Sequence, residues 1–205
     1  PSFALRQPPL VPVLAVVLSL ACLRALFPTQ SCSEGIDRVA GTLFVVLYVG
    51  LTLGHLGGLF RFGQSVLERQ RGGAFALLLL AAVYVGDTAA MYGGKAFGRR
   101  KLAPGVSPAK TWEGAFFGMA ASIGATLAAR VLLLPDVPPL HAGLLGVVLG
   151  AMGILGDLTE SLLKRAAAVK DSGTLLPGHG GMLDRVDSLL LAAPVVYWYQ
   201  RLLLG

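Results

Sequence analysis

The chain is poor in charged residues. Only 14% of its 205 residues are Asp, Glu, Lys or Arg, whereas 55% are hydrophobic. Soluble domains carry about a quarter charged residues, and the mean hydropathy here is +0.71. This composition excludes an ordinary soluble domain. The formal net charge of +6 is small, so it suits anionic lipid head groups or phosphates better than nucleic acid.

The chain also lacks the short motifs of several enzyme classes. Its two cysteines, Cys22 and Cys32, form no CxxC pair, so neither a zinc site nor a redox motif is indicated. It has no GxxxxGK(S/T) loop, which excludes a P-loop NTPase. It has no GxSxG elbow and no HExxH helix, so hydrolases and metalloproteases of those types are excluded too.

What the chain has instead is long apolar runs. A run of about 18 residues or more predicts a transmembrane helix, because about 20 residues cross the hydrocarbon core of a bilayer. Barrel strands would alternate apolar and polar residues, and "AFALLLLAAVYVG" (74–86) does not. The sequence therefore predicts an all-α fold, a polytopic integral membrane helix bundle of about six transmembrane helices. The six runs lie at residues 9–27, 39–60, 74–93, 114–134, 141–163 and 186–204.

Little polar sequence remains for a separate soluble domain. We therefore expect a single membrane domain over residues 1–205, with N-terminal spans at 1–73 and a core at 74–205 that carries the polar motifs. The first run leaves an alternative, because residues 10–27 could also be the apolar core of a signal peptide. No small-residue cleavage pattern follows it cleanly.

The lysines mark one side of the membrane. All five lie in or beside two segments, 94–113 and 164–185. With six spans these segments emerge on the same side, and an excess of Lys and Arg marks the cytoplasmic side. The connection at 61–73 carries three arginines on the opposite side, so the bias is not absolute. We expect both lysine-rich segments to be cytoplasmic and both chain ends to lie outside.

The first polar motif is the segment 86–114. Asp87 falls near the cytoplasmic end of the third run, and an ionisable side chain at membrane depth is costly enough to indicate function. Pro104 and Pro108 stiffen the loop that follows. Ser107, Lys110 and Thr111 in this loop form a set that can bind phosphate oxygens. Glu113 suits the N-terminus of the next helix, where negative charge is favourable.

The second motif is "GDLTESLLKR" (156–165). Asp157, Glu160, Ser161 and Lys164 are spaced i, i+3, i+4 and i+7, so they share one helical face. The alternative reading is structural: Asp157 with Ser161, and Glu160 with Lys164, can pair locally on the helix. That reading fits Asp157 least, because it lies nearest the lipid core.

The third motif is "KDSGTLLPGHGGMLDRVD" (170–187). Gly178, Gly180 and Gly181 flank His179 and permit close approach of the backbone to a ligand. Asp184 and Asp187 stand three residues apart at the start of the last run. Compensation of a helix N-terminus explains one such acid well but two less well.

Together these motifs indicate phosphate chemistry. Asp87, Asp157 and Asp184 come from three different runs at similar depth, and hard oxygen ligands of this kind suit Mg²⁺, which bridges substrate phosphates. The surrounding Lys and Arg side chains would neutralise a polyphosphate. We expect phosphoryl or nucleotidyl transfer, in which positioning and charge neutralisation supply most of the catalysis.

At its defining positions "SLLKRAAAVKDSGTLLPGHGGMLDRVD" (161–187) resembles the signature of the phosphatidate cytidylyltransferase family, the CDP-diacylglycerol synthases. That signature combines Ser, Lys-Arg, Lys-Asp, Pro, His-Gly-Gly and Asp-Arg-x-Asp at fixed intervals. The segment "DTAAMYGGKAFGRRKLAPGVSPAKTWEG" (87–114) is similar to the family's other characteristic segment. The resemblance covers roughly residues 75–205, the expected catalytic core.

The resemblance implies transfer of CMP from CTP to phosphatidic acid, giving CDP-diacylglycerol and pyrophosphate in phospholipid biosynthesis. It implies Mg²⁺ held by Asp157 and Asp184, and it leaves room for a second, monovalent cation and for a homodimer. Asp87, Lys110 and Lys164 would complete the catalytic set. The location implied is the inner (plasma) membrane of a bacterium with the site facing the cytoplasm. The expected substrate-binding residues are Ser107, Thr111, Arg165, Lys170, His179, Gly180, Gly181, Arg185 and Asp187.

The chain departs from the family pattern in two respects. Met91 stands where the family usually has an aromatic residue, with Tyr92 next to it. Family members are also longer at the N-terminus, so we expect the N-terminal spans here to be truncated relative to the family.

Three other functions stay open. One is a CTP-dependent enzyme acting on another lipid phosphate, either on an ether-lipid analogue or as a lipid kinase. Another is a membrane transporter, since acids inside the membrane and glycine-interrupted helices also occur in carriers. The crowding of acids and lysines at one surface argues against it. The third is a folded but inactive relative.

Overall fold

The computed structural model describes residues 10–26, 32–60, 65–169, 172–173 and 181–204. The chain separates into two compact units, Pro1–Leu51 and Thr52–Gly205. The first unit holds α1 (Leu10–Leu26), α2 (Cys32–Val45) and the π-helical segment η1 (Val46–Leu51). All three polar motifs fall in the second unit.

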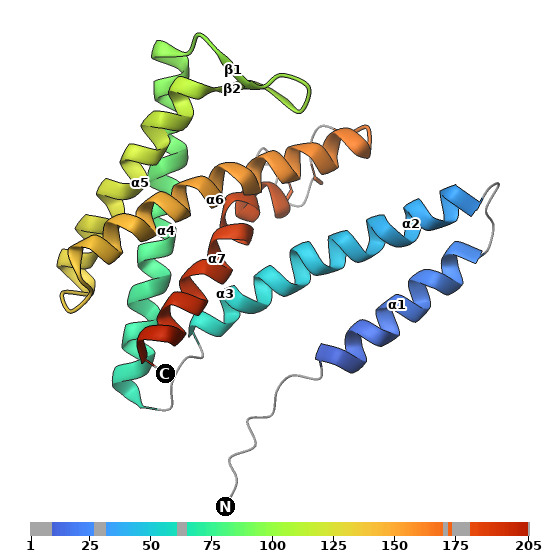
Figure 1. The fold of residues 1–205 in the computed structure, drawn as a ribbon, viewed down its shortest axis with the longest axis horizontal. Coiled ribbons are helices and arrows are strands. Elements are labelled where there is room, and N and C mark those ends of the chain that lie inside the picture. Colours follow the sequence, from blue (N-terminus) through green and yellow to red (C-terminus); the bar gives the residue numbers. More distant parts are fainter. Residues whose placement is uncertain (1–9, 27–31, 61–64, 170–171, 174–180, 205) are drawn as a thin grey trace, which may run out of the picture. The chain divides into compact units, whose positions relative to one another are not determined.

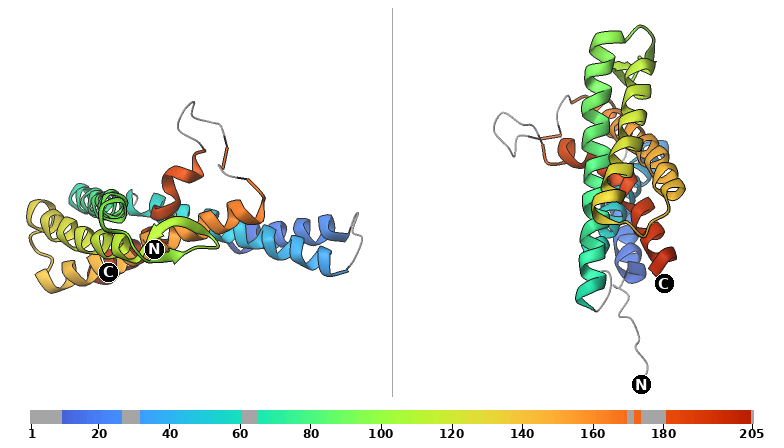
Figure 2. Two further views of the ribbon diagram at one scale, coloured as in Figure 1. Left: turned by 90° about the horizontal axis from the view of Figure 1, so that it is seen from above. Right: turned by 90° about the vertical axis from the view of Figure 1, so that its left-hand side faces the viewer.

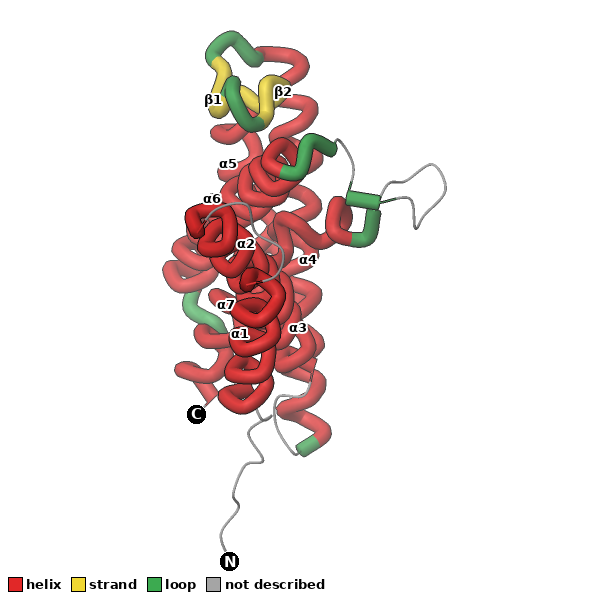
Figure 3. Tube along the Cα trace, turned by 90° about the vertical axis from the view of Figure 1, so that its right-hand side faces the viewer, coloured by secondary structure: helices red, strands yellow, loops and turns green. Residues whose placement is uncertain are grey.

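The second unit is a helical bundle with one small hairpin. In it α4 and α5 lie side by side, joined by the hairpin at one end, and α6 packs against α5 and α7 (Figures 1 and 2). Most of the described residues are helical (Figure 3). The elements of the second unit are α3 (Thr52–Phe60), α4 (Val66–Phe97), β1 (Lys101–Ala103), β2 (Ser107–Thr111), α5 (Trp112–Leu133), α6 (Pro139–Ala166) and α7 (Leu183–Leu204).

The helical fold expected from the apolar runs is confirmed, since the described part of each run is almost entirely helical. In the described part of the chain, four helical stretches are long and apolar enough to cross a membrane. They are Ser33–Phe60, Val66–Phe97, Trp112–Leu133 and Pro139–Ala166. The count of about six spans stays a prediction, because α1 and α7 are not among these four. The single membrane domain also stays a prediction.

The hairpin was not expected from the sequence, which predicts only helices. β1 and β2 are antiparallel, with Lys101 opposite Thr111, Ala103 opposite Ser107 and an irregularity between the two pairs. The segment around Ser107 and Lys110, predicted to be a stiff phosphate-binding loop, is instead a short strand. Proline is normally excluded from the middle of a sheet, so Pro108, which lies within β2, gave no indication of a strand.

Side-chain caps set the starts of α4 and α5, the two helices that the hairpin connects. Ser65 caps α4: its hydroxyl accepts from the Glu68 N–H at 3.2 Å, and the Glu68 carboxylate accepts from the Ser65 N–H at 2.9 Å. This reciprocal pair is a capping box. Thr111, the last residue of β2, caps α5 by accepting from the Gly114 N–H at 3.1 Å. The hairpin thus leads directly into α5.

Small residues bring the helices together. A Cβ on Gly86 would meet the Ser122 hydroxyl, and a Cβ on Gly118 would meet Ala90. The Ser122 hydroxyl also donates to the Ala82 carbonyl at 2.7 Å. Small residues allow such close approach between membrane helices. The backbones of α4 and α5 are therefore nearly in contact below the hairpin.

Candidate functional site

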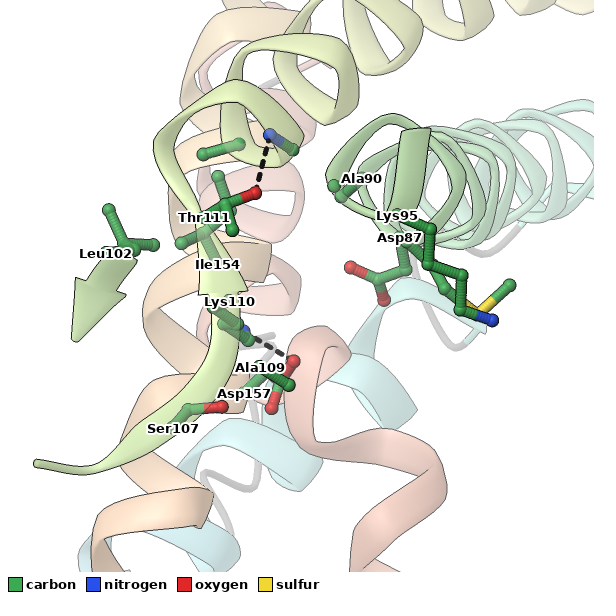
Figure 4. Close-up of a pocket in the computed structure, with 14 residues that line it drawn as sticks. Asp87, Ala90, Lys95, Leu102, Ser107, Ala109, Lys110, Thr111, Ile154 and Asp157 are labelled. Atoms are coloured by element: carbon green, nitrogen blue, oxygen red, sulfur yellow. Dashed lines mark hydrogen bonds and ion pairs between the residues drawn. The ribbon is translucent and has the colours of Figure 1, made fainter. Parts of the chain in front are cut away.

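A cavity of about 360 Å³ lies where α4, the hairpin, α5 and α6 meet. Its polar lining comes from three of these four elements (Figure 4). The polar residues that line it are Asp87 and Lys95 on α4, Ser107, Lys110 and Thr111 on β2, and Asp157 on α6. The structure thus places four expected site residues of the first motif and one of the second around one cavity.

An ion pair crosses this cavity from the hairpin to α6. The Lys110 ammonium lies 2.5 Å from Asp157 Oδ2, and both side chains are largely buried, 22% and 32% exposed. Figure 4 shows the Asp87 carboxylate pointing into the cavity from α4. Asp87 interacts electrostatically with both partners of the pair. Two carboxylates and one cation therefore meet inside the cavity.

A cluster of acids lies on the α7 side of Asp157. Ligand atoms of Asp157, Glu160 and Asp187 all lie within 4.8 Å of one another. Asp187 also interacts electrostatically with Asp87. Carboxylates from α6 and α7 therefore cluster, with Asp87 of α4 near enough to interact with them, whereas the convergence predicted from the sequence named Asp184 in place of Asp187. In the described residues the α7 member of the cluster is Asp187.

Gly156 makes this convergence possible. A Cβ at this position would collide with the backbone carbonyl of Asp187 and would stand 3.1 Å from the Cα of Ser188. The backbone of α6 therefore rests directly on α7 one residue before Asp157. No larger residue would let Asp157 and Asp187 approach in this way.

Glu160 is the most deeply buried acid of the cluster, with its side chain 1% exposed. Its Oε2 lies 2.7 Å from the Lys164 ammonium. Its Oε1 is buried and has no hydrogen-bond partner among the described residues. A buried carboxylate oxygen without a partner is costly, so a cation is the natural complement. Sequence reasoning did not include Glu160 in the site.

The local pairs considered from the sequence are both present. The Ser161 hydroxyl donates to Asp157 Oδ1 at 3.4 Å, and Lys164 pairs with Glu160. Asp157 also pairs with Lys110 of the hairpin, so purely local pairing does not account for it, and its functional role stays a prediction.

Asp184 is held by protein donors. Its Oδ1 accepts from the Lys164 ammonium at 2.7 Å, and its Oδ2 accepts from Ser172 and Gly181. Burial tends to raise the pKa of Asp184, but the hydrogen bonds from Lys164 and Ser172 outweigh it and hold that pKa well below its usual range. Asp184 is thus an ionised acceptor, and its role as a metal ligand stays a prediction.

Other predicted residues lie around the hairpin. Arg165 Nε donates to the Val106 carbonyl at 3.5 Å, so the end of α6 reaches the hairpin turn. Glu113 stands in the first turn of α5, as expected, and accepts from the backbone N–H groups of Arg99 and Arg100 at 3.0 and 3.2 Å. It therefore ties the end of α4 to the start of α5.

The remaining predicted residues lie at the start of α7 or outside the described residues. Arg185 is exposed, and its backbone carbonyl accepts from the Tyr84 hydroxyl at 3.4 Å. Gly181 is buried, and a Cβ there would collide with the Ser172 hydroxyl. Steric crowding thus accounts for this glycine without a ligand. Lys170, His179 and Gly180 lie outside the described residues.

Helices long and apolar enough to span a membrane, together with a cluster of carboxylates and a cavity lined by lysines and acids, indicate a membrane-bound protein with a charged site. The sequence pattern of the cytidylyltransferase family matches residues 4–203, and the chain belongs to that family. The resemblance drawn from the motifs is thereby confirmed.

Several curated proteins are similar over part of the chain. An uncharacterized protein of Escherichia coli K12, YnbB, is 46% identical over 132 residues, covering 64% of this chain and 44% of its own length. A phosphatidate cytidylyltransferase of Pseudomonas aeruginosa is 50% identical over 120 residues, covering 58% and 44%. Another from Brucella suis is 41% identical over 164 residues, covering 78% and 56%. The chain thus spans about half the length of these relatives.

Proposed function

We propose that the chain transfers the CMP group of CTP to phosphatidic acid, giving CDP-diacylglycerol and pyrophosphate. Membership of the cytidylyltransferase family and the names of the relatives from Pseudomonas and Brucella support this reaction. The observation that carries it is the cavity crossed by the Lys110–Asp157 pair beside the acid cluster. Such a site offers both signs of charge, which a nucleoside triphosphate and its metal ion require.

The donor set fits Mg²⁺. Mg²⁺ takes oxygen ligands and is usually bound through one or two carboxylates together with substrate phosphates and waters. Asp157, Glu160 and Asp187 supply clustered carboxylate oxygens, and Glu160 Oε1 is buried without another partner among the described residues. We assign the ion to these three side chains. When bound, it would neutralise charge that develops on the phosphate oxygens.

The protein's cations would hold the two anionic substrates together. Lys110 and Lys95 line the cavity, and Lys164 stands beside the acid cluster. An oxygen of the lipid phosphate forms a bond to the α-phosphorus of CTP while the bond to the β-phosphate breaks, and pyrophosphate leaves with the electron pair. The lipid phosphate is largely doubly ionised at neutral pH, since its second pKa is about 6. No strong general base is therefore needed.

The lysines around the site support a cytoplasmic placement, because an excess of Lys and Arg marks that side of a membrane. We propose that the hairpin and the ends of α4 and α6 face the cytoplasm at the inner membrane of a bacterium, with six helices crossing the bilayer. CTP would reach the cavity from water and phosphatidic acid from the lipid. A second, monovalent cation and a homodimer stay predictions.

Labelled CTP tests the reaction directly. The purified chain in nanodiscs containing phosphatidic acid is given CTP labelled at either the α- or the γ-phosphate. Label from the α-phosphate in the lipid, with release of pyrophosphate and loss of activity in EDTA, is the expected result. Label from the γ-phosphate in the lipid identifies a lipid kinase instead. No transfer to phosphatidic acid, but transfer to an ether-lipid analogue, contradicts the substrate assignment, and ion flux without nucleotide would indicate a transporter.

A further inference from the structure

The Asp184 carboxylate joins the start of α7 to Ser172, twelve residues earlier in the sequence, and to Lys164 near the end of α6. Its Oδ2 accepts from the Ser172 hydroxyl at 2.6 Å, from the Ser172 N–H at 3.0 Å and from the Gly181 N–H at 2.9 Å. The Ser172 hydroxyl in turn accepts from the Asp184 N–H at 3.3 Å. We call the arrangement of Ser172, Gly181, Asp184 and Lys164 the Asp184 clamp.

The clamp extends into the acid cluster. Asp184 Oδ1 accepts from the Lys164 ammonium at 2.7 Å, and the same ammonium lies 2.7 Å from Glu160 Oε2. Glu160 is one of the three clustered acids. A continuous chain of polar contacts therefore runs from Ser172 through Asp184 and Lys164 to Glu160.

Ser172 donates two hydrogen bonds to the Asp184 carboxylate, one from its N–H and one from its hydroxyl. A carboxylate has about four acceptor positions, and Ser172 supplies two of the hydrogen bonds that fix the carboxylate plane of Asp184. Loss of the hydroxyl would free Asp184 Oδ2 to turn and would remove the acceptor of the Asp184 N–H. Lys164 would then lose the fixed geometry of one of its two carboxylate partners.

We propose that Ser172 is a positioning residue for the transfer reaction, acting through Asp184 to set the place of the Lys164 ammonium. This role rests on the proposed function. Ser172 would not touch either substrate. Ser172 would keep the Lys164 ammonium correctly placed relative to the substrate phosphates. Loss of the Ser172 hydroxyl should therefore lower kcat more than it weakens substrate binding.

The test compares three variants in nanodiscs. S172A removes the hydroxyl, S172T keeps one, and T88A is a matched control, because the Thr88 hydroxyl donates to the Tyr84 carbonyl within α4 at 2.7 Å. We expect S172A to lower kcat about ten-fold with the KM for CTP within about two-fold, as a small misplacement would. S172T should restore most of the rate, and T88A should match the wild type.

Hydrogen exchange supplies a readout that does not depend on activity. The Asp184 amide should exchange about ten-fold faster in S172A than in the wild type or T88A, since it loses its acceptor. Unchanged kcat in S172A, or equally low kcat in S172A and S172T, overturns the positioning role. Unchanged exchange overturns the clamp itself. A wild-type chain that transfers no CMP overturns the proposed function and the role of Ser172 with it, while the exchange data still report whether the clamp exists.

Discussion

The Lys110 ammonium and the Asp157 carboxylate, 2.5 Å apart, join the hairpin to α6 across the cavity. One residue comes from a five-residue strand and the other from a long helix. The pair therefore fixes the hairpin over the cavity and at the same time presents both signs of charge to a ligand. Removing either partner should disturb both functions.

Substitution of Lys110 tests this pair. We expect K110A to lower kcat/KM about 100-fold or more, the scale seen when one preorganised charge-stabilising group is removed. K101A is the matched control, since Lys101 lies on the other strand of the same hairpin and is exposed. It should change the rate less than about three-fold, as expected for an exposed charge. Initial rates in nanodiscs measure both, and similar losses in the two variants would show that general hairpin charge is what matters.

The metal assignment predicts a changed demand for Mg²⁺. E160Q and D187N should each raise the Mg²⁺ concentration needed for half-maximal activity about ten-fold or more, because each removes a charged ligand. D184N discriminates between the two views of the ligand set: it should leave that concentration nearly unchanged if Asp184 is an acceptor for protein donors only. D37N, an exposed acid in the first unit, serves as the control. If that Mg²⁺ concentration rises in D184N but not in E160Q or D187N, the ion should be assigned to Asp184 instead.

Packing at Gly156 should control stability as well as the site. G156A puts a methyl group into the backbone of Asp187, so we expect destabilisation by about 1–3 kcal/mol, as for other overpacked sites. A Cβ on Gly143 of the same helix would meet no atom of the described residues within 4 Å, so G143A should be neutral or stabilising by up to about 1 kcal/mol. Thermal unfolding in detergent compares them. Equal midpoints would mean that α6 and α7 are not in close contact.

Thr111 separates a structural role from a substrate-binding one. T111A removes the cap of α5 and should cost about 1 kcal/mol of stability, whereas T111S keeps the hydroxyl and the cap. Thr111 also lines the cavity but is only 7% exposed. We expect the KM for CTP in T111A to stay within about three-fold of wild type, since the hydroxyl already accepts from Gly114. A large rise in KM with unchanged stability would support direct substrate contact.

The shared face of the polar residues on α6 could be predicted from the sequence, although Glu160 was not assigned to the site. Asp157, Glu160, Ser161 and Lys164 share a face because helical periodicity is a local property, and the structure shows the pairs that this spacing allows. Which acid of α7 joins them is harder to predict from the sequence. Asp184 and Asp187 are three residues apart, so periodicity alone barely separates their directions. The choice depends on the tertiary contact between Gly156 on α6 and the backbone of α7, which helical periodicity does not reveal.

Two features of the structure, the hairpin and the role of Ser172, could not be predicted from the sequence. The hairpin carries Pro104 and Pro108, which indicate a loop, and its strands are too short to show alternation. Ser172 is a single hydroxyl outside the regular elements, and although it lies within the third motif it is not one of the signature's defining residues. Its importance arises only because Asp184, twelve residues later, returns to it.

The length of α4 has a consequence for where the chemistry happens. A crossing that starts at Ala74 uses about 20 residues at about 1.5 Å each to traverse a hydrocarbon layer about 30 Å thick, and so ends near Gly93. Asp87 then lies about 9 Å below that boundary, while Lys95 and the hairpin stand above it. With the bilayer placed in this way, the cavity would span the boundary between hydrocarbon and water, where the proposed lipid substrate and the proposed water-soluble one could react without either leaving its own phase.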